Sequence, residues 1–230
     1  MLEHILDYEK HAFLWMNSGH SAFFDQFMWL FSGKIAWIPL VIVFIVALSY
    51  KNKRHWKELL LILIAIIIVI TLCDQFASSF CKPFFSRLRP THHPDFMDRV
   101  NIVFDYRGGL YGFISSHAAN SFGFVTLTSL FFRNKLYSIM MFIWAIINSY
   151  SRIYLGVHFI SDIVPGIITG FFFGWIVYKL FILIKPKHIS YSFQFSGINI
   201  VCYTLLLTVV VMTTISLLYS LNVIPALTVK

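Results

Sequence analysis

Six long apolar stretches dominate this chain of 230 residues. Only 12% of the residues are charged, whereas soluble domains average about 25%. About 20 consecutive apolar residues are enough to cross a bilayer as a helix. The stretches are Phe24–Tyr50, Leu59–Phe80, Ser116–Phe132, Leu136–Ser149, Ile160–Ile184 and Ile198–Leu221. The sequence therefore predicts an all-α fold, a six-span transmembrane helical bundle that forms a single domain over residues 1–230.

Two of the predicted spans have unusual lengths. The first is long and is interrupted at Ser32-Gly33-Lys34, so we expect it to tilt or kink there. The fourth is short, and we expect its helix to continue past Arg152 towards Tyr154.

The N-terminal segment Met1–Asn17 contains acidic residues and lacks the continuous apolar core of a signal peptide. Its apolar residues fall near one helical face: Leu2, Ile5, Leu6, Phe13 and Met16. This pattern predicts an amphipathic helix that lies on the membrane surface. A frayed polar tail is the alternative reading of the same segment.

Basic residues are concentrated in the loops after the first, third and fifth spans. They are Lys51, Lys53, Arg54, Lys57, Arg133, Lys135, Lys179, Lys185 and Lys187. Because cytoplasmic loops are enriched in lysine and arginine, we expect these loops to be cytoplasmic. The long loop after span two, Cys81–Ser115, then faces outward, on the periplasmic side of a bacterial inner membrane. Its prolines and glycines predict that no long helix crosses it unbroken.

Three polar clusters interrupt the apolar pattern, and all are predicted to lie on the outward side. They are Lys82 with Arg89-Pro90, then Ser115-Ser116-His117, then Ser151-Arg152 with His158 and Asp162. Cations gathered at one pole of a bundle, with little acid to pair them, predict an anion site. Arginine matches phosphate oxygens, and the amide groups that begin a helix also attract anions. We therefore expect a phosphate to be bound by Lys82, Arg89, Ser115, Ser116 and Arg152.

The two histidines suggest a division of labour in phosphate ester chemistry. His158 and Asp162 are four residues apart, which on a helix places them on one face. A carboxylate there fixes the imidazole tautomer, so His158 is the expected nucleophile and would form a phosphohistidine. His117 is the expected general acid and base. No carboxylate cluster suits magnesium or zinc, so neither a metal nor another cofactor is expected.

These residues resemble the three-part signature of the type 2 phosphatidic acid phosphatase superfamily. Lys82 with Arg89-Pro90 matches its first part, and Ser151, Arg152, His158 and Asp162 match its third part. In the second part Ser115 and His117 match, but Ile114 replaces the usual proline and Ser116 the usual glycine. The resemblance covers about residues 60–180 and implies the same site roles. It leaves the first and last spans unexplained.

The resemblance implies a metal-independent membrane phosphatase that hydrolyses a lipid phosphate monoester or diphosphate. Lipid A, undecaprenyl diphosphate and phosphatidylglycerophosphate are candidate substrates, of which the first two are favoured. A lipid phosphotransferase is the main alternative, because a phosphohistidine can pass its phosphoryl group to other acceptors. An anion transporter is disfavoured because the polar groups gather at one end of the bundle. The expected partners are the lipid substrate and the bilayer, with no nucleic acid; the oligomeric state is left open.

Several other residues have ordinary interpretations. We interpret Arg87 as a surface or lipid-headgroup contact, and His92-His93 as a solvated loop pair with no suitable third metal ligand. Asp74, within span two, either braces the site from below or pairs with a neighbouring helix. We expect the cysteines to be small apolar fillers; they are Cys73, Cys81 and Cys202.

Overall fold

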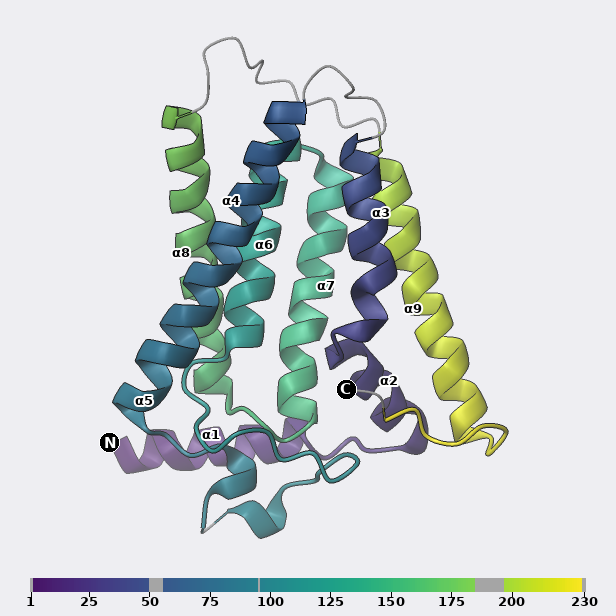
Figure 1. Cartoon of the computed structure of the whole chain (residues 1–230). Helices are drawn as coiled ribbons and strands as arrows, with labels where there is room; N and C mark the ends of the chain where they lie inside the picture. The colour runs from purple at the N-terminus through teal and green to yellow at the C-terminus, as the bar shows by residue number, and fades with distance from the viewer. Residues whose placement is uncertain (1, 50–55, 95, 185–196, 229–230) are drawn as a thin grey trace.

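The computed structural model describes residues 2–49, 56–94, 96–184 and 197–228 of the chain (Figure 1). Within those ranges the regular structure is helical, apart from one isolated bridge between Leu88 and Tyr111. The long helices are α1 (Leu2–Met16), α2 (Ala22–Ser32), α3 (Ile38–Ser49), α4 (Trp56–Gln75), α6 (Ser116–Phe132), α7 (Lys135–Tyr154), α8 (Ile160–Ile184) and α9 (Ile198–Ser220). The short elements are η1 (Ile35–Trp37), η2 (Phe76–Cys81), α5 (Lys82–Phe85), η3 (Pro90–His92) and η4 (Met97–Arg99). The all-α prediction is confirmed for the described part of the chain.

Among the described residues, three helices are long and apolar enough to cross a membrane, or four if α2 and α3 form one bent span. The three are Leu59–Phe85, Ile160–Ile184 and Ile198–Ser220. Helices α6 and α7 stand beside them in the bundle (Figure 1), but α6 has only 17 residues and α7 carries Lys135 and Arg152. The six-span count therefore stays a prediction. So does the orientation, because most of the basic loop residues lie outside the described ranges.

The interruption predicted in the first span is a sharp bend. Segments Ala22–Ser32 and Ile35–Leu48 meet at 70°. At the bend the Gly33 N–H still bonds to the carbonyls of the preceding turn. The Trp37 indole N–H donates to the Phe31 carbonyl across it at 2.8 Å. Ser32 is buried at the bend, whereas Lys34 just after it is exposed.

The second span extends further than predicted. Its helix runs through Lys82 to Phe85, so the expectation that a loop begins at Cys81 was wrong. The turn before Pro83 is π-helical, with the Lys82 N–H bonded to the Ala77 carbonyl, and the helix tolerates the proline there. Consequently Lys82 projects from a helix, and the connecting segment starts at Ser86, whose φ of 45° is left-handed.

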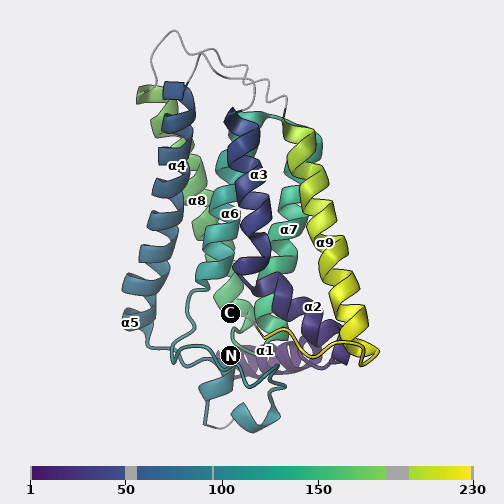
Figure 2. The same cartoon turned by 45° about the vertical axis from the view of Figure 1, so that its right-hand side comes forward.

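Helix α6 is the centre of the bundle and packs against α4, α7 and α8 (Figure 2). Its contact with α8 is close because glycines face it. A Cβ atom on Gly170 would lie 2.6 Å from the Ala119 carbonyl oxygen, and one on Gly174 would lie 2.8 Å from the Gly123 carbonyl oxygen. Small residues that let backbones touch are characteristic of helix pairs in membranes. This contact holds the start of α6 beside the start of α8, where two of the polar clusters lie.

Helix α1 lies across one end of the bundle (Figure 1). The predicted N-terminal helix is therefore confirmed, and the frayed tail was wrong. Phe13 is fully buried against Phe96 and Phe159, with ring centroids 5.6 and 5.3 Å away. On its other side Tyr8 and Trp15 are exposed, as expected for aromatic residues at a membrane interface. Its position on a membrane surface stays a prediction.

The segment between α5 and α6 lies at the same end as α1 (Figure 1). Among its described residues the helical elements are the short turns η3 and η4, as the prolines and glycines predicted. Phe96, Val100 and Val103 are buried. Phe96 and Val100 pack with residues of α1, α6, α7 and α8, and Val103 packs with residues of α2 and α7, so the segment is anchored to the end of the bundle. The three cysteines are buried and form no disulfide, which agrees with their interpretation as apolar fillers.

Candidate functional site

His158 lies in the turn between α7 and α8. The chain reverses at Gly156, whose φ is +75° and whose Cβ would lie 2.6 Å from a Val100 methyl group. Since α8 begins at Ile160, the expectation that His158 shares a helix with Asp162 was wrong. The two still meet, because Asp162 reaches back from the first turn of α8, as an acidic residue of a capping box does. Its Oδ2 accepts the Phe159 N–H at 2.9 Å and lies 3.3 Å from His158 Nδ1.

The hydrogen bonds around His158 define a tautomer. With Nδ1–H donating to Asp162, the Nε2 atom carries the lone pair, and Arg89 Nη1 donates to it at 3.3 Å. The imidazole is 1% exposed. Burial, reinforced by the charges of Arg89, Arg152 and Lys82, holds the pKa of His158 well below 6.5. The ring is therefore neutral at neutral pH, as a nitrogen nucleophile requires.

Arg89 is held by two backbone carbonyls, one in the segment that precedes α6 and one in the turn between α7 and α8. Its Nε donates to the Tyr111 carbonyl at 3.1 Å and its Nη1 to the Val157 carbonyl at 3.2 Å. A Cβ atom on Gly108 would lie 2.9 Å from Nη1, so this glycine makes room for the guanidinium. Burial and the charge of Arg152 lower the pKa of Arg89 to about 10. The side chain remains a cation at neutral pH.

Arg152 comes from the last turn of α7 and is 4% exposed. Its Nη1 donates to Ser32 Oγ at the bend between α2 and α3, and its Nη2 donates to the Tyr106 hydroxyl at 3.1 Å. Its Nε is buried without a hydrogen-bond partner among the described residues. A buried N–H without an acceptor is costly, so an anion bound here would supply what Nε lacks.

The second cluster joins the other two at the start of α6. Ser115 is the N-cap: its Oγ accepts the Ala118 N–H at 3.4 Å, and the hydroxyl proton stays available to donate. The Ser115 N–H donates to the Asp162 carbonyl at 2.9 Å. Lys82 Nζ donates to Ser116 Oγ at 2.9 Å. His117 follows Ser116 in the chain and interacts electrostatically with Arg152 and His158.

The structure thus brings the predicted site residues to one end of the bundle, from three separate segments. They are Lys82, Arg89, Ser115, Ser116, His117, Arg152, His158 and Asp162. Cations outnumber acids in this group. The arrangement can bind a phosphate group next to a neutral imidazole nitrogen.

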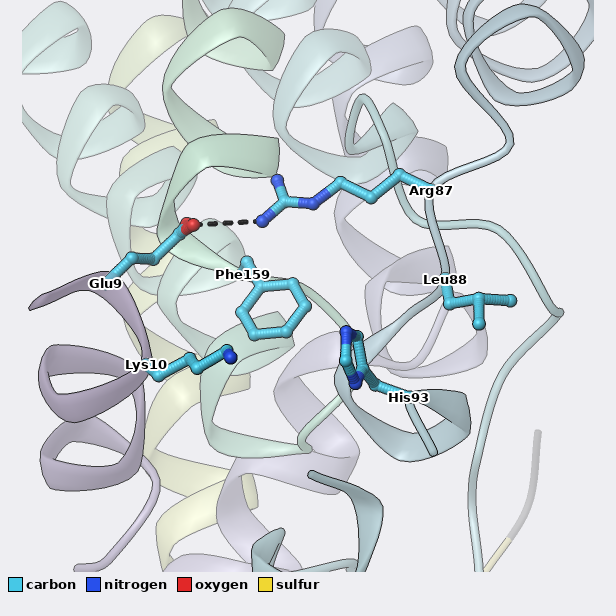
Figure 3. Close-up of a pocket in the computed structure, with 6 residues that line it drawn as sticks. All are labelled: Glu9, Lys10, Arg87, Leu88, His93 and Phe159. Atoms are coloured by element: carbon cyan, nitrogen blue, oxygen red, sulfur yellow. Dashed lines mark hydrogen bonds and ion pairs between the residues drawn. The ribbon is translucent and has the colours of Figure 1, made fainter. Parts of the chain in front are cut away.

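Arg87 was interpreted as a surface contact, and the structure shows otherwise. Its Nη1 pairs with Asp162 Oδ1 and its Nη2 with Glu9 Oε2, both at 2.9 Å (Figure 3). No local pattern indicates the Glu9 contact, because residues 78 apart along the chain meet only through the placement of α1. Arg87 does have a signal in the sequence, because it lies between Lys82 and Arg89 of the first motif. It is not at one of the motif's fixed positions.

Other contributors also went unnoticed in the sequence. Ser32 and Tyr106 hold Arg152, and Gly112 lies so close to the site that a Cβ there would be 2.9 Å from Asp162 Oδ2. The interruption at Ser32-Gly33-Lys34 predicts the bend, but nothing in it indicates that Ser32 contacts Arg152. Asp74 accepts a hydrogen bond from Asn120 of α6 at 3.4 Å, so it pairs with a neighbouring helix.

A cavity of about 580 Å³ opens beside the site and has mainly apolar walls. Its polar end is lined by His117, Ser32 and Lys34, and its length by residues of α3 and α4 such as Val41 and Ile67. Ile67 is 64% exposed, so the cavity reaches the outer surface of the bundle. It has room for an apolar chain with its polar end at His117.

In the part of the chain that is described, no group of three or more His, Cys, Asp or Glu side chains is placed to hold a metal ion. His92 and His93 are half-buried, and His92 contacts the Thr91 hydroxyl at 3.1 Å. Burial lowers the pKa of His92, and nearby Arg89 and Arg107 lower it further.

The chain is similar to known proteins in sequence and in fold. Residues 58–186 match the family model described as the PAP2 superfamily. A protein of Porphyromonas gingivalis named lipid A 4'-phosphatase is 44% identical over 193 residues, which cover 83% of this chain and 80% of that one. A protein of the same name from Bacteroides thetaiotaomicron is 42% identical over 179 residues, covering 77% of this chain and 79% of that one.

One solved structure is similar in fold. It is a transmembrane PAP2-type phosphatidylglycerolphosphate phosphatase from Bacillus subtilis, with a TM-score of 0.61 over 80% of this chain and 90% of that one. At 18% sequence identity this similarity concerns the fold alone.

Proposed function

This chain belongs to the PAP2 superfamily, and from that premise we propose that it is a membrane phosphatase that removes the 4'-phosphate of lipid A. Two relatives more than 40% identical carry the name lipid A 4'-phosphatase, which supports a phosphoric ester hydrolase acting on a membrane lipid. The long apolar helices support its place in a membrane.

The observation that carries the proposal is the set of cationic side chains around His158 Nε2. Arg89 donates to this atom, and Arg152 and Lys82 act on the same imidazole electrostatically. A bound phosphoryl group would replace the Arg89–Nε2 contact. Its oxygens would accept hydrogen bonds from the guanidinium and ammonium groups. Cations around the equatorial oxygens stabilise the charge of the transition state.

The proposed reaction has two steps. His158 Nε2 attacks phosphorus, the bond from phosphorus to the lipid oxygen breaks, and His117 donates a proton to the leaving alkoxide. A water molecule then attacks the phosphohistidine, His117 takes a proton from it, and the N–P bond breaks to release inorganic phosphate. Asp162 keeps the Nδ1 proton in place throughout.

The cavity of about 580 Å³ supports a lipid substrate. It runs from His117 between α3 and α4, so a headgroup phosphate at the site leaves its apolar chain along these helices. We further propose that α6 and α7 complete six spans and that the site faces the periplasm. Labelling of single cysteines placed in the connecting segments of the intact membrane protein tests that topology.

An assay of the purified protein in detergent tests the substrate. Lipid A, undecaprenyl diphosphate and phosphatidylglycerophosphate are compared at equal concentration, with and without a chelator. We expect lipid A to be turned over fastest, with mass spectrometry locating the loss at the 4'-position. Faster release from either other lipid would overturn the substrate proposal, and loss of activity with chelator would overturn the metal-free mechanism.

The variant His158→Ala tests the chemistry. We expect turnover to fall by on the order of 10⁴-fold or more, since loss of a nucleophile removes the covalent route. The protein should remain folded in size-exclusion chromatography. Near-normal activity would refute the phosphohistidine mechanism.

A further inference from the structure

Helix α1 lies outside the signature region, yet it reaches the site through a single acidic side chain. Glu9 Oε1 accepts the backbone N–H of Ser161 at 2.8 Å, one of the free amide groups at the start of α8. Its Oε2 pairs with Arg87 at 2.9 Å. Figure 3 shows Glu9 and Arg87 joined across the top of a cavity of about 230 Å³, with Lys10 and His93 on its other walls.

Arg87 carries this contact onward to the site. Its guanidinium carbon lies 4.6 Å from the centre of the Phe159 ring, and Nη1 pairs with Asp162 Oδ1 at 2.9 Å. The same Nη1 donates to the Ser161 hydroxyl. Four neighbours therefore hold the guanidinium in one position, and only the Glu9 carboxylate comes from outside α8 and its preceding turn.

Each oxygen of Asp162 has a separate partner. Oδ2 faces His158 Nδ1 at 3.3 Å and accepts the Phe159 N–H, while Oδ1 faces Arg87. The position of Arg87 thus influences where Oδ2 points and how much of the carboxylate charge acts on the imidazole. A carboxylate that orients a catalytic imidazole is most effective when its own position is held by another group.

We propose that Glu9 is a positioning residue for the nucleophile, acting through Arg87 on the Asp162–His158 pair. This inference rests on the proposed phosphatase function, because it assigns a role within the same site. With this role for Glu9, α1 both covers the end of the bundle and helps to hold the catalytic imidazole in place.

The proposal predicts opposite pH effects for the two residues. The charged and titratable groups around His158 are Arg89, Arg87 and Lys82 from the segment of α5 and its loop, Arg152 from α7, Asp162 from α8 and His117 from α6. Removing the Arg87 cation leaves Asp162 to act fully on the ring, which raises the pKa of His158. Removing the Glu9 charge leaves Arg87 uncompensated, which lowers that pKa.

The experiment measures kcat and KM against pH for the full-length protein in detergent with lipid A as substrate. We expect Glu9→Gln and Arg87→Gln each to lower kcat by on the order of tenfold with KM within about twofold. The acid limb of kcat/KM should move up by about one pH unit in Arg87→Gln and down by about half a unit in Glu9→Gln. The double variant should be no slower than the slower single variant, because the two residues act as a unit.

Lys10→Gln is the matched control. Lys10 is the next residue on α1 and lines the same cavity, but no hydrogen bond or ion pair joins it to Arg87 or Asp162 among the described contacts. It should keep the wild-type rate and pH profile. If Glu9→Gln and Arg87→Gln behave like Lys10→Gln, or if their acid limbs do not move in opposite directions, the proposal is wrong.

Glu9→Gln keeps a side-chain oxygen that can accept the Ser161 amide. Its effect therefore reports loss of the ion pair with Arg87 and not loss of the cap of α8. Arg87→Lys keeps the positive charge at this position. Nitrogen NMR of the His158 ring reports its pKa without turnover and decides the question even if a variant is inactive. An unchanged ring pKa in Glu9→Gln overturns the inference. An active His158→Ala protein would instead refute the phosphohistidine mechanism, and a wild-type protein that hydrolyses none of the three lipids would refute the proposed function, so these failures are distinguishable.

Discussion

Asp162 has no exposed side-chain surface, and both of its oxygens are occupied. A buried carboxylate is tolerated only when it is paired and hydrogen-bonded, and here a guanidinium, an imidazole and a backbone amide share the task. The residue is therefore sensitive to small displacements from any side. The backbone of the segment before α6 passes directly over it at Gly112.

Substituting this glycine tests that sensitivity. In Gly112→Ala the new Cβ would lie 2.9 Å from Asp162 Oδ2 and 3.3 Å from Arg89 Cγ, so one of them has to move. We expect kcat to fall between roughly tenfold and a hundredfold, since a displacement of about 1 Å costs that much in a preorganised site. The measurement is steady-state turnover of lipid A.

Gly109→Ala is the control, because a Cβ there meets nothing within 4 Å. It lies in the same segment and should leave kcat within about twofold of wild type. Equal losses in the two variants would mean that the segment as a whole is fragile and that contact with Asp162 is not the cause.

At the scale of elements, the contact between α6 and α8 brings two parts of the candidate site together. His117 and Ser115 come from the start of α6, and Asp162 comes from the start of α8. Gly166, Gly170 and Gly174 are four residues apart on α8 and face α6. Their spacing keeps the two helices in contact over several turns, which holds the relative height of the two starts.

The substitution Gly170→Ala should loosen this pair. Its Cβ would lie 2.6 Å from the Ala119 carbonyl and 2.8 Å from the Gly123 nitrogen, and neither backbone atom can move away cheaply. We expect a loss of about 1–3 kcal/mol in stability, as for other overpacked interiors. Thermal unfolding in detergent measures it, with turnover recorded in parallel.

Ile168→Ala provides the comparison on the same helix. Ile168 is 62% exposed on the outer face of α8 and does not face α6. Its truncation should change the unfolding temperature far less than Gly170→Ala does. A larger effect from Ile168→Ala would argue against close α6–α8 contact as the determinant of stability.

The whole molecule places its polar residues at one end and an apolar cavity along its length. The cavity of about 580 Å³ joins the two, from His117 to the outer surface between α3 and α4. A lipid has the same division between a polar head and apolar chains. The shape of the molecule therefore suits a substrate that stays partly within the bilayer during reaction.

Narrowing the cavity should lower the turnover of lipid substrates more than the turnover of water-soluble ones. We expect Ile67→Trp, at an exposed position on the cavity wall, to lower turnover of long-chain lipid by on the order of tenfold. Hydrolysis of a short-chain, water-soluble phosphate ester should change less than about twofold, because such a substrate needs only the polar end.

Ile139→Trp is the corresponding control, since Ile139 is exposed on α7 and is not among the residues that line the cavity. It should affect neither substrate. If Ile67→Trp reduces both substrates equally, the cavity is not the route for the lipid chain.

Much of this architecture could be read from the order of residues. The bounds of α6 and α8 match their predicted stretches, Ser116–Phe132 and Ile160–Ile184, because a change from polar to apolar residues marks each helix end. The candidate site residues stand out for a related reason: ionisable groups are rare in apolar sequence, so each is conspicuous.

Other features had no local signal. The helix through Lys82 to Phe85 depends on a π turn, and the separation of His158 from α8 depends on how Asp162 caps that helix. Neither follows from spacing alone.

Hydrophobicity and spacing act through neighbours on the chain, so most of the long helices, the bend near Gly33 and the residue types of a candidate phosphate site follow from the sequence alone. The ion pair from Glu9 through Arg87 to Asp162, the closeness of Gly112 and the cavity between α3 and α4 arise between segments far apart in the chain. Only the packing of whole helices brings such segments together, because contact at a distance in sequence depends on the shape of everything between them.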